Sequence, residues 1–355
     1  MKKKVLGVLL SVAMVSTLLI GCGAKPAPAP EEPAKEPAVE EPAEEPAAEE
    51  PEVEEPEVEE ATAGEKLVVG FAQIGQESGW RDAETASIQG YAEENSDTVE
   101  LKFADAQQKQ ENQIKAIKTF IEQGVDVIGL APVVETGWDQ VFAEAQEAGI
   151  PIVLVDRTAD VSEDLYSTFI GSDFVEEGKM AADEMAALIG EEGTIVELEG
   201  TVGASAATDR KTGFDDQIAA AYPNITIAAS QTGDFTRAQG KEVMESFLKA
   251  HDDIKGVYAH NDDMALGAIE AIKEAGLKPG EDIKIVSIDG VRAIFEAMAA
   301  GEANVTVECN PLLGPLFFET AAKLKAGEEV EKWVKSVDGI FRADTAEADL
   351  PTRQY

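Results

Sequence analysis

The chain has 355 residues, with 29 Lys and Arg against 70 Asp and Glu, which gives a formal net charge of −41. So acidic a chain excludes a nucleic-acid-binding protein, because such proteins need a cationic face to displace the counterions of phosphate groups. A hydrophobic fraction of 44% excludes disorder for most of the chain, and 2 cysteines are too few for a disulfide framework. The length allows one or two domains.

The first 22 residues have the pattern of a lipoprotein signal sequence. Three lysines at 2–4 precede an apolar stretch over 5–20, which is short for a transmembrane helix. Residues 19–22, Leu-Ile-Gly-Cys, resemble the lipobox of bacterial lipoproteins. That resemblance implies a signal peptide over 1–21, cleavage before Cys22, lipidation of its sulfur, and attachment to the outer face of the cell membrane. The alternative is an ordinary signal peptide or a transmembrane anchor, with Cys22 incidental.

Residues 22–65 are predicted to form an extended acidic tether. Glu-Glu-Pro and Pro-Ala units repeat here, and residues 31–60 alone carry a net charge of −14. Proline favours polyproline II and like charges repel, so residues 23–64 reach at most about 130 Å. We interpret the segment as a spacer between the membrane and a globular domain, with an acidic interaction tail as the alternative.

From residue 66 onwards the sequence alternates between apolar runs of strand length and amphipathic segments with helical spacing. Helices are predicted around 112–124 and 263–276, and Gly124, Gly149 and Gly276 each mark the end of a helix. Near-continuously apolar strands separated by helices predict an α/β fold with parallel sheets covered on both faces. The predicted strands are 67–74, 99–106, 125–132, 150–157, 194–200, 225–233, 254–262, 283–290 and 303–309.

Several kinds of chemistry are not supported by the sequence. It contains no phosphate-binding G-x-x-x-x-G-K-[ST] loop, no G-x-G-x-x-G after a strand and no H-E-x-x-H, so we expect no cofactor and no metal. Ser205 lies in a stretch close to a nucleophile elbow, with His260 downstream as a candidate base, but a helix cap is the simpler interpretation. Paired carboxylates for a glycosidase cannot be identified without a distance between them.

Polar residues gather at the carboxyl ends of the predicted strands, which is where ligands bind in open α/β sheets. Planar groups that donate or accept several hydrogen bonds, together with aromatic surfaces, suit the hydroxyls and the apolar face of a sugar. Arg and Asp placed together also lower the cost of burying either charge. These candidate residues are Trp80, Arg81, Asp105, Asp156, Arg157, Arg210, Asn261 and Asp289.

Residues 67–310 resemble the periplasmic sugar-binding proteins of ABC importers, which have the ribose-binding type of fold. The stretches GQESGWR, QQKQENQ and TGDFTRAQGKEVMESF resemble the galactofuranose-binding group of that family in particular. The resemblance implies a type I periplasmic binding protein with two doubly wound parallel-sheet lobes and a three-segment hinge near Gly171, Cys309 and Gly339. The implied N-terminal lobe spans 66–170 and 309–338, and the implied C-terminal lobe spans 171–308 and 339–355.

The resemblance also implies roles for individual residues at a ligand site. Trp80 would lie against the sugar ring, Asp156 and Arg157 would clamp hydroxyls, and Arg210 would reach in from the second lobe. Asp105 would accept a hydroxyl hydrogen, and Asn261 and Asp289 would complete the site. The same comparison adds Glu77, Ser78, Gly79, Arg81 and, near a crossover between the lobes, Glu308.

The function implied is capture of a neutral monosaccharide, galactofuranose or a similar furanose or aldose, by hinge closure. The partners implied are an ABC permease and its cytoplasmic ATPase, and the protein would be a monomer and not an enzyme. The −31 net charge of the globular part suits a neutral ligand. A sugar-sensing lipoprotein that signals to a chemoreceptor or kinase is the alternative, and an extracytoplasmic glycosidase is a further one.

Overall fold

The computed structural model describes residues 65–355. The predicted signal peptide over 1–21, the predicted lipidation site Cys22 and the predicted tether as far as residue 64 lie outside the described residues. Within 65–355, none of the helices is both long enough and apolar enough to cross a membrane.

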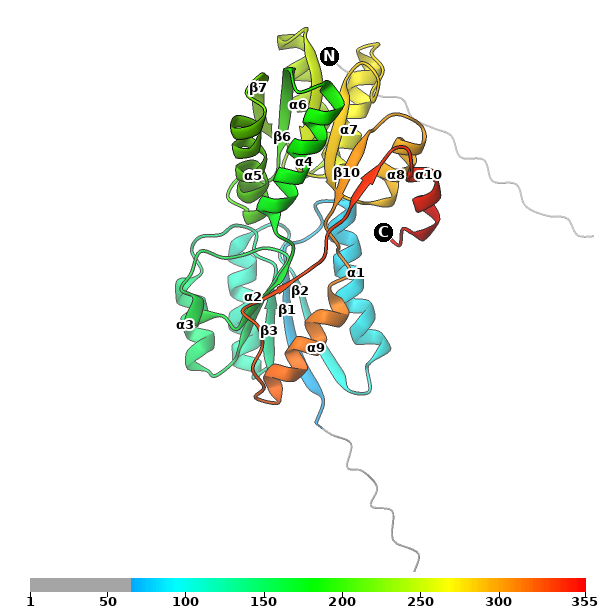
Figure 1. The fold of residues 1–355 in the computed structure, drawn as a ribbon. Coiled ribbons are helices and arrows are strands. Elements are labelled where there is room, and N and C mark those ends of the chain that lie inside the picture. The colour runs from blue at the N-terminus through cyan, green and yellow to red at the C-terminus, as the bar shows by residue number, and fades with distance from the viewer. Residues whose placement is uncertain (1–64) are drawn as a thin grey trace, which may run out of the picture. The chain divides into compact units, whose positions relative to one another are not determined.

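The first lobe is built on a six-stranded sheet with the order β11-β5-β4-β3-β1-β2, in which every neighbouring pair is parallel (Figure 1). Two separate hydrophobic clusters cover its two faces, one containing side chains of α1 and α9 and the other containing those of α2 and α3. The elements are β1 (Leu67–Gln73), α1 (Gly79–Glu94), β2 (Val99–Asp105), α2 (Gln110–Gln123), β3 (Val127–Leu130), α3 (Asp139–Glu147), β4 (Ile152–Val155), β5 (Thr168–Gly171), α9 (Gly314–Lys325) and β11 (Trp333–Lys335).

The second lobe repeats this design with the strand order β12-β10-β9-β8-β6-β7. Its pairs are parallel except that of β10 with β12, which is antiparallel, so this sheet is mixed at one edge. The elements are α4 (Phe174–Ile189), β6 (Gly193–Glu199), α5 (Ser205–Ala221), β7 (Ile225–Thr232), α6 (Arg237–Ala250), β8 (Ile254–Ala259), α7 (Asp262–Glu274), β9 (Lys284–Asp289), α8 (Arg292–Ala299), β10 (Val305–Glu308), β12 (Ile340–Arg342) and α10 (Ala346–Asp349).

The expected α/β fold with two parallel-sheet lobes is confirmed, and each of the nine predicted strands is present to within a few residues at its ends. Gly124, Gly149 and Gly276 follow the ends of α2, α3 and α7 with φ of 63°, 73° and 79°. That left-handed conformation favours glycine, which explains why these positions mark helix ends. The short strands β5, β11 and β12 were not predicted.

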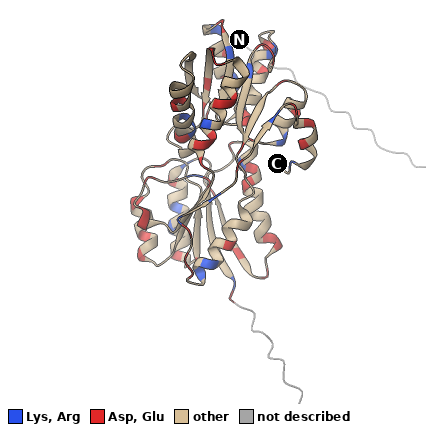
Figure 2. Ribbon diagram, in the orientation of Figure 1, with Lys and Arg blue, Asp and Glu red and all other residues tan. Residues whose placement is uncertain are grey.

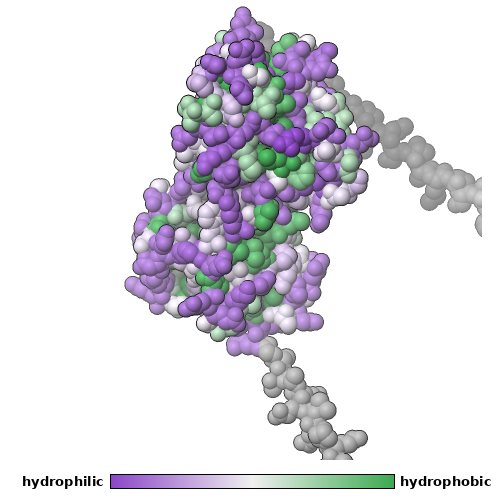
Figure 3. Space-filling model, in the orientation of Figure 1, coloured by the Kyte–Doolittle hydropathy of each residue, from purple (hydrophilic) through white to green (hydrophobic). Residues whose placement is uncertain are grey.

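The chain passes between the two sheets at three places (Figure 1). These connections run from β5 to α4, from β10 to α9 and from β11 to β12. Hydrophobic residues gather in the middle of the face drawn in Figure 3, where the connections cross, and Val337 in the third of them is 88% exposed. The exact limits of the two lobes stay a prediction.

Acidic side chains are distributed over the helices of both lobes, with fewer basic side chains between them (Figure 2). Most of these acidic residues are exposed or half-buried, and a few, such as Glu84 of α1 and Glu177 of α4, are buried. Other charged groups, among them Arg81, Arg157 and Arg210, are buried.

Candidate functional site

A cavity lies where the carboxyl ends of the strands of both lobes meet, and we call it the inner cavity. Loops after β1 and β4 approach it from the first lobe, and the segments that follow β6, β7, β8 and β9 approach it from the second. It has room for about one water molecule, with a volume of about 20 Å³. It is lined by Glu77, Ser78, Trp80, Arg81, Asp156, Arg157, Ala206, Arg210, Phe235, Asn261 and Asp289.

Two of the lining carboxylates are presented by unusual backbone conformations at strand ends. Asp156 directly follows β4 with φ of 65°, and Asp289 ends β9 with φ of 129°. Non-glycine residues at positive φ carry strain of order 1–3 kcal/mol and cluster at functional sites. The strained backbone turns the chain at the point where each strand meets the cavity.

Arg81 is the centre of a buried ionic network in the first lobe. It is 1% exposed, and its Nε and Nη1 lie 3.3 Å from Glu77 and 2.7 Å from Glu84, while Nη2 donates to Asp156. Burial lowers the pKa of Arg81, but the carboxylates of Asp156, Glu84 and Glu77 raise it well above its ordinary value. Ser78 caps α1 by accepting from the Arg81 backbone N–H over 3.2 Å, which holds Arg81 in the first turn of the helix.

Arg157 is buried and retains free hydrogen-bond donors. Its Nη2 donates to Glu77 over 2.5 Å, and its guanidinium lies 5.1 Å from the ring of Phe235 in the other lobe. Its Nε and Nη1 have no hydrogen-bond partner among the described residues, although the side chain is only 3% exposed. Burial, together with the positive charges of Arg81 and Arg210, lowers the pKa of Arg157. A hydroxyl-rich molecule would satisfy both free donors.

Arg210 has the corresponding position in the second lobe. Its Nε donates to Glu177 over 2.7 Å, its Nη1 donates to the His260 carbonyl over 2.6 Å, and its Nη2 lies 3.5 Å from Asp289. Burial raises the pKa of Glu177 to about 7 and raises that of Asp289 well above its ordinary value. The side chain of Arg210 is therefore fixed at the cavity by Glu177, the His260 carbonyl and Asp289.

Asn261 lines the cavity, but its amide is committed to the protein. Its Oδ1 caps α7 by accepting from the Met264 N–H over 3.0 Å, and its Nδ2 donates to the Phe235 carbonyl over 3.1 Å. The residue therefore fixes the loop that carries Phe235. Its hydrogen bonds give it a role in positioning this loop, in addition to any contact with a bound molecule.

Trp80 connects the lobes. It is the second residue of α1 in the first lobe, yet it packs into the hydrophobic cluster of the second lobe and is 4% exposed. Its indole Nε1 donates to the carbonyl of Cys309, in the second connection between the sheets, over 2.5 Å. Gly79, its neighbour, lies beside the cavity lining and donates its N–H to Asp263 of α7 over 2.7 Å. The start of α1 is thus inserted into the second lobe.

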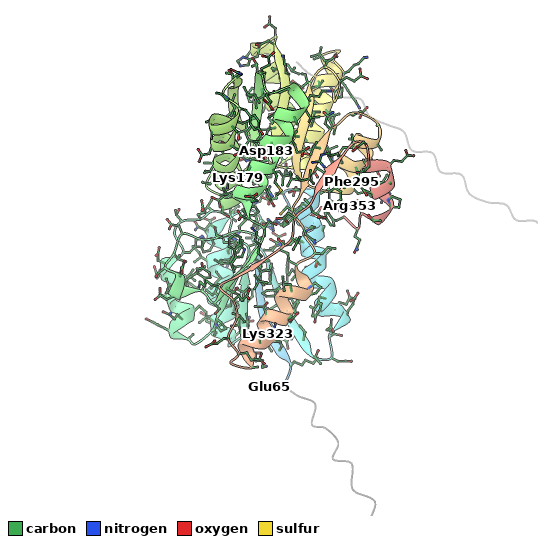
Figure 4. The ribbon with its side chains drawn as sticks, viewed as in Figure 1. Glu65, Lys179, Asp183, Phe295, Lys323 and Arg353 are labelled. Atoms are coloured by element: carbon green, nitrogen blue, oxygen red, sulfur yellow. The ribbon has the colours of Figure 1, made fainter. Side chains whose placement is uncertain are left out.

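Asp105 and Glu308 do not line the inner cavity. Asp105 ends β2, the edge strand of its sheet, and it is exposed and accepts from the Gln107 N–H over 2.7 Å. Glu308 accepts from Arg353 over 2.9 Å and from the Tyr355 hydroxyl over 3.0 Å. Arg353 itself lies 4.8 Å from the ring of Phe295 (Figure 4). Both expected ligand residues therefore bond within the protein in this structure.

Sequence reasoning missed two lining residues, Phe235 and Ala206. Phe235 lies shortly after the end of β7, so the rule that residues at strand ends form the site would have found it. Its φ of 58° is a further sign of a functional position. Ala206 is the second residue of α5 and has no functional group, so no chemical signal in the sequence indicates it.

The geometry does not support the serine-hydrolase alternative. Ser205 lies at a helix N-terminus as expected, but it is the first residue of α5 and the cap position is Ala204, so the expected capping role is wrong. Its Oγ instead accepts from the Thr158 N–H of the other lobe over 3.0 Å. Both ring nitrogens of His260 are engaged, Nδ1 with the Gly200 N–H at 3.2 Å and Nε2 with Glu197 at 2.9 Å. His260 is therefore not available as a base for Ser205.

Comparisons with known proteins agree with the fold. The periplasmic binding protein domain family matches residues 69–329. The galactofuranose-binding protein YtfQ of Escherichia coli K12 is 52% identical over 294 residues, which is 81% of this chain and 92% of that protein.

Two solved structures are similar over most of the chain. A Mycobacterium smegmatis protein in complex with β-D-fucofuranose is 54% identical with a TM-score of 0.79, covering 81% of this chain and 95% of that one. The binding protein of the arabinose ABC transporter of Shewanella sp. ANA-3, bound to α- and β-L-arabinofuranose, is 50% identical with a TM-score of 0.78, with the same coverage. The chain therefore belongs to the periplasmic binding proteins, within the sugar-binding proteins of ABC transporters.

Proposed function

We propose that the protein captures a neutral furanose, galactofuranose or a closely similar sugar, in the inner cavity and delivers it to an ABC permease. The observation that carries this proposal is the set of charged groups around the cavity. Three arginines face three carboxylates, so their formal charges balance, and two buried donors of Arg157 have no hydrogen-bond partner in the described part of the chain. Such a lining favours a neutral ligand with many hydroxyls over an anion or a cation.

Capture requires the lobes to separate and close again. The inner cavity has a volume of about 20 Å³, which is far too small for a sugar ring. Its lining comes from both lobes, so a sugar would contact both and stabilise the closed state. Three connecting segments between the sheets could act as the hinge, with 66–170 and 309–338 moving against 171–308 and 339–355.

The chain would act outside the cytoplasm as a lipid-anchored monomer. The lipobox-like residues that end at Cys22 support attachment through a lipid, and the acidic tether over 22–65 would hold the two lobes away from the membrane. Mass spectrometry of the mature N-terminus tests the anchor. A diacylglyceryl group on Cys22 that is lost in Cys22→Ser supports it, and an unmodified Cys22 would contradict it.

Titration calorimetry tests the ligand. Galactose and arabinose are each titrated, with the concentration corrected for the furanose fraction, and the ring form bound is then identified in a ligand-bound crystal structure. We expect a furanose in the inner cavity and no measurable affinity for a galactopyranoside locked in its ring form. No binding of either sugar would overturn the proposed ligand class.

A further inference from the structure

A second cavity lies beside the inner one, and we call it the outer cavity. Its volume is about 190 Å³, compared with about 20 Å³ for the inner cavity. It is formed by both lobes, because the loops after β1, β2, β3 and β4 and the segments after β6 and β7 all contribute to it. Its polar lining includes Glu77, Gln108, Arg157, Thr201, Asp234 and Gln239.

The outer cavity contains the groups that a polyhydroxylated molecule needs. Ile74 and Val133 give it a buried apolar part, at 0% and 7% exposed. Gln108 donates its Nε2 to the Gln76 carbonyl over 2.6 Å and keeps its Oε1 as an acceptor. The side chains of Thr201 and Gln239 make no hydrogen bond to other residues in the described part of the chain. Amides, a hydroxyl and an apolar surface together suit a sugar ring.

The two cavities share one ion pair. Glu77 and Arg157 line both of them, and Arg157 Nη2 donates to Glu77 Oε1 over 2.5 Å. Arg157 is buried, and its Nε and Nη1 have no hydrogen-bond partner within residues 65–355. A molecule that occupied both cavities would lie next to this ion pair and would accept hydrogen bonds from Arg157. The charged groups of the outer lining have both signs, Glu77 and Asp234 against Arg157, so a neutral extension fits better than an anionic one.

We infer that the outer cavity is a second saccharide subsite, so that the cleft takes a furanose carrying a further sugar on its anomeric oxygen as well as the free monosaccharide. This inference rests on the proposed function, because it places the furanose itself in the inner cavity. The second ring lies against Val133, which is backed by the buried Ile74, and bonds to Gln108, Thr201 and Gln239.

Three compounds test the subsite by titration calorimetry: galactofuranose, its methyl β-glycoside, and the methyl glycoside of a disaccharide of two β-linked D-galactofuranose rings. We expect the disaccharide to bind at least tenfold more tightly than the methyl glycoside, since only the disaccharide carries the second ring. Gln239→Ala should weaken disaccharide binding three- to tenfold, the effect of one or two lost hydrogen bonds, and leave the affinity for galactofuranose within twofold.

Gln140→Ala is the matched control, because Gln140 is an exposed glutamine of α3 that bonds only to Glu144. It should change neither affinity. The inference is overturned, with the proposed function intact, if galactofuranose binds and the disaccharide binds no more tightly than the methyl glycoside. It is overturned too if Gln239→Ala weakens both compounds equally. If galactofuranose itself does not bind, the proposed function fails, and the subsite fails with it.

Discussion

Glu177 of α4 accepts a hydrogen bond from the Nε of Arg210 of α5 over 2.7 Å, and both side chains are buried. The two helices pack closely enough for this bond because glycines face the partner helix. A Cβ on Gly178 would lie 2.3 Å from the Arg210 carbonyl oxygen, and a Cβ on Gly213 would lie 2.0 Å from that of Val175. The packing of two helices outside the cavity therefore sets where Arg210 reaches into it.

We expect Gly178→Ala to destabilise the protein by about 1–3 kcal/mol, because the new methyl group would collide with backbone and force α4 and α5 apart. Thermal unfolding measures the effect. Gly90→Ala in α1 is the matched control, since no atom lies within 4 Å of its added Cβ. That substitution should leave stability unchanged or raise it by about 0.5–1 kcal/mol, the helix preference of alanine over glycine. Equal effects of the two substitutions would contradict the packing argument.

Arg157→Ala should lower the affinity for the furanose by well over tenfold. The variant removes donors that are buried and unpaired in this structure, and hydrogen bonds from charged groups contribute about 1.5–3 kcal/mol each. Titration calorimetry measures the change. Arg157→Lys keeps the charge but loses the planar fork, so an intermediate affinity is expected. An affinity of Arg157→Ala equal to that of the wild type would remove this residue from the site.

Arg81→Met should destabilise the protein by about 3–5 kcal/mol, because it leaves the buried carboxylates of Glu84 and Asp156 without their cation. Urea unfolding measures the loss. Arg342→Met is the control, since Arg342 pairs with Glu184 at the surface and its side chain is 50% exposed. Such a pair contributes at most about 1 kcal/mol. A small effect of Arg81→Met would show that the network is compensated elsewhere.

The stability of the protein should depend on pH through Glu177. Burial raises the pKa of this carboxyl to about 7 in the folded protein, compared with an ordinary 4.5. Its contribution to stability is therefore full below about pH 4.5 and is lost as the pH rises through 7, a change of about 3 kcal/mol.

Glu177→Gln removes this titration and keeps an oxygen that can accept from Arg210. The difference in the free energy of unfolding between variant and wild type should therefore grow in favour of the variant from pH 5 to pH 8. Chemical denaturation at several pH values measures it. Parallel curves for the two proteins would contradict the raised pKa of Glu177.

Sugar affinity should rise as the pH falls, because the carboxyl group of Glu135 in the first lobe lies close to Asp209 in the second lobe where the two lobes touch. The Glu135 N–H donates to the Gly203 carbonyl over 2.8 Å, and its carboxylate accepts from Thr208, both in the other lobe. Burial raises the pKa of Glu135, with the charges of Asp209 and Asp160 adding to it. If closure creates this contact, Glu135 binds a proton more tightly in the closed state than in the open state. Protonation then stabilises the closed state, and this stabilisation is lost as the pH rises through the raised pKa of Glu135.

Calorimetry at pH 5.5 in two buffers of different ionisation enthalpy measures the protons taken up on sugar binding. Glu135→Gln should reduce the uptake and flatten the dependence of affinity on pH. Equal binding enthalpies in the two buffers would show that closure does not change the protonation of these groups.

The strands could be predicted where their apolar runs were long enough to be distinctive. β5, β11 and β12 have four, three and three residues and lie at or near the sheet edges, so they give little periodicity.

Nine of the twelve expected binding residues line the inner cavity, because the ends of parallel strands share one edge of a sheet. Asp105 does not line the inner cavity for a geometric reason: its strand, β2, is the edge strand of the first sheet.

The sequence by itself determined the alternation of strands and helices, the acidic charge that excludes nucleic acid, and the strand-end residues that indicate a sugar, since these follow from periodicity and composition. Only the tertiary structure decided which carboxylates are buried partners of the arginines. Glu84 and Glu177 look like any other helix acid in so acidic a chain, and their burial beside Arg81 and Arg210 depends on how the helices pack. The shared use of Glu77 and Arg157 by two cavities depends likewise on two lobes meeting, which no local pattern records.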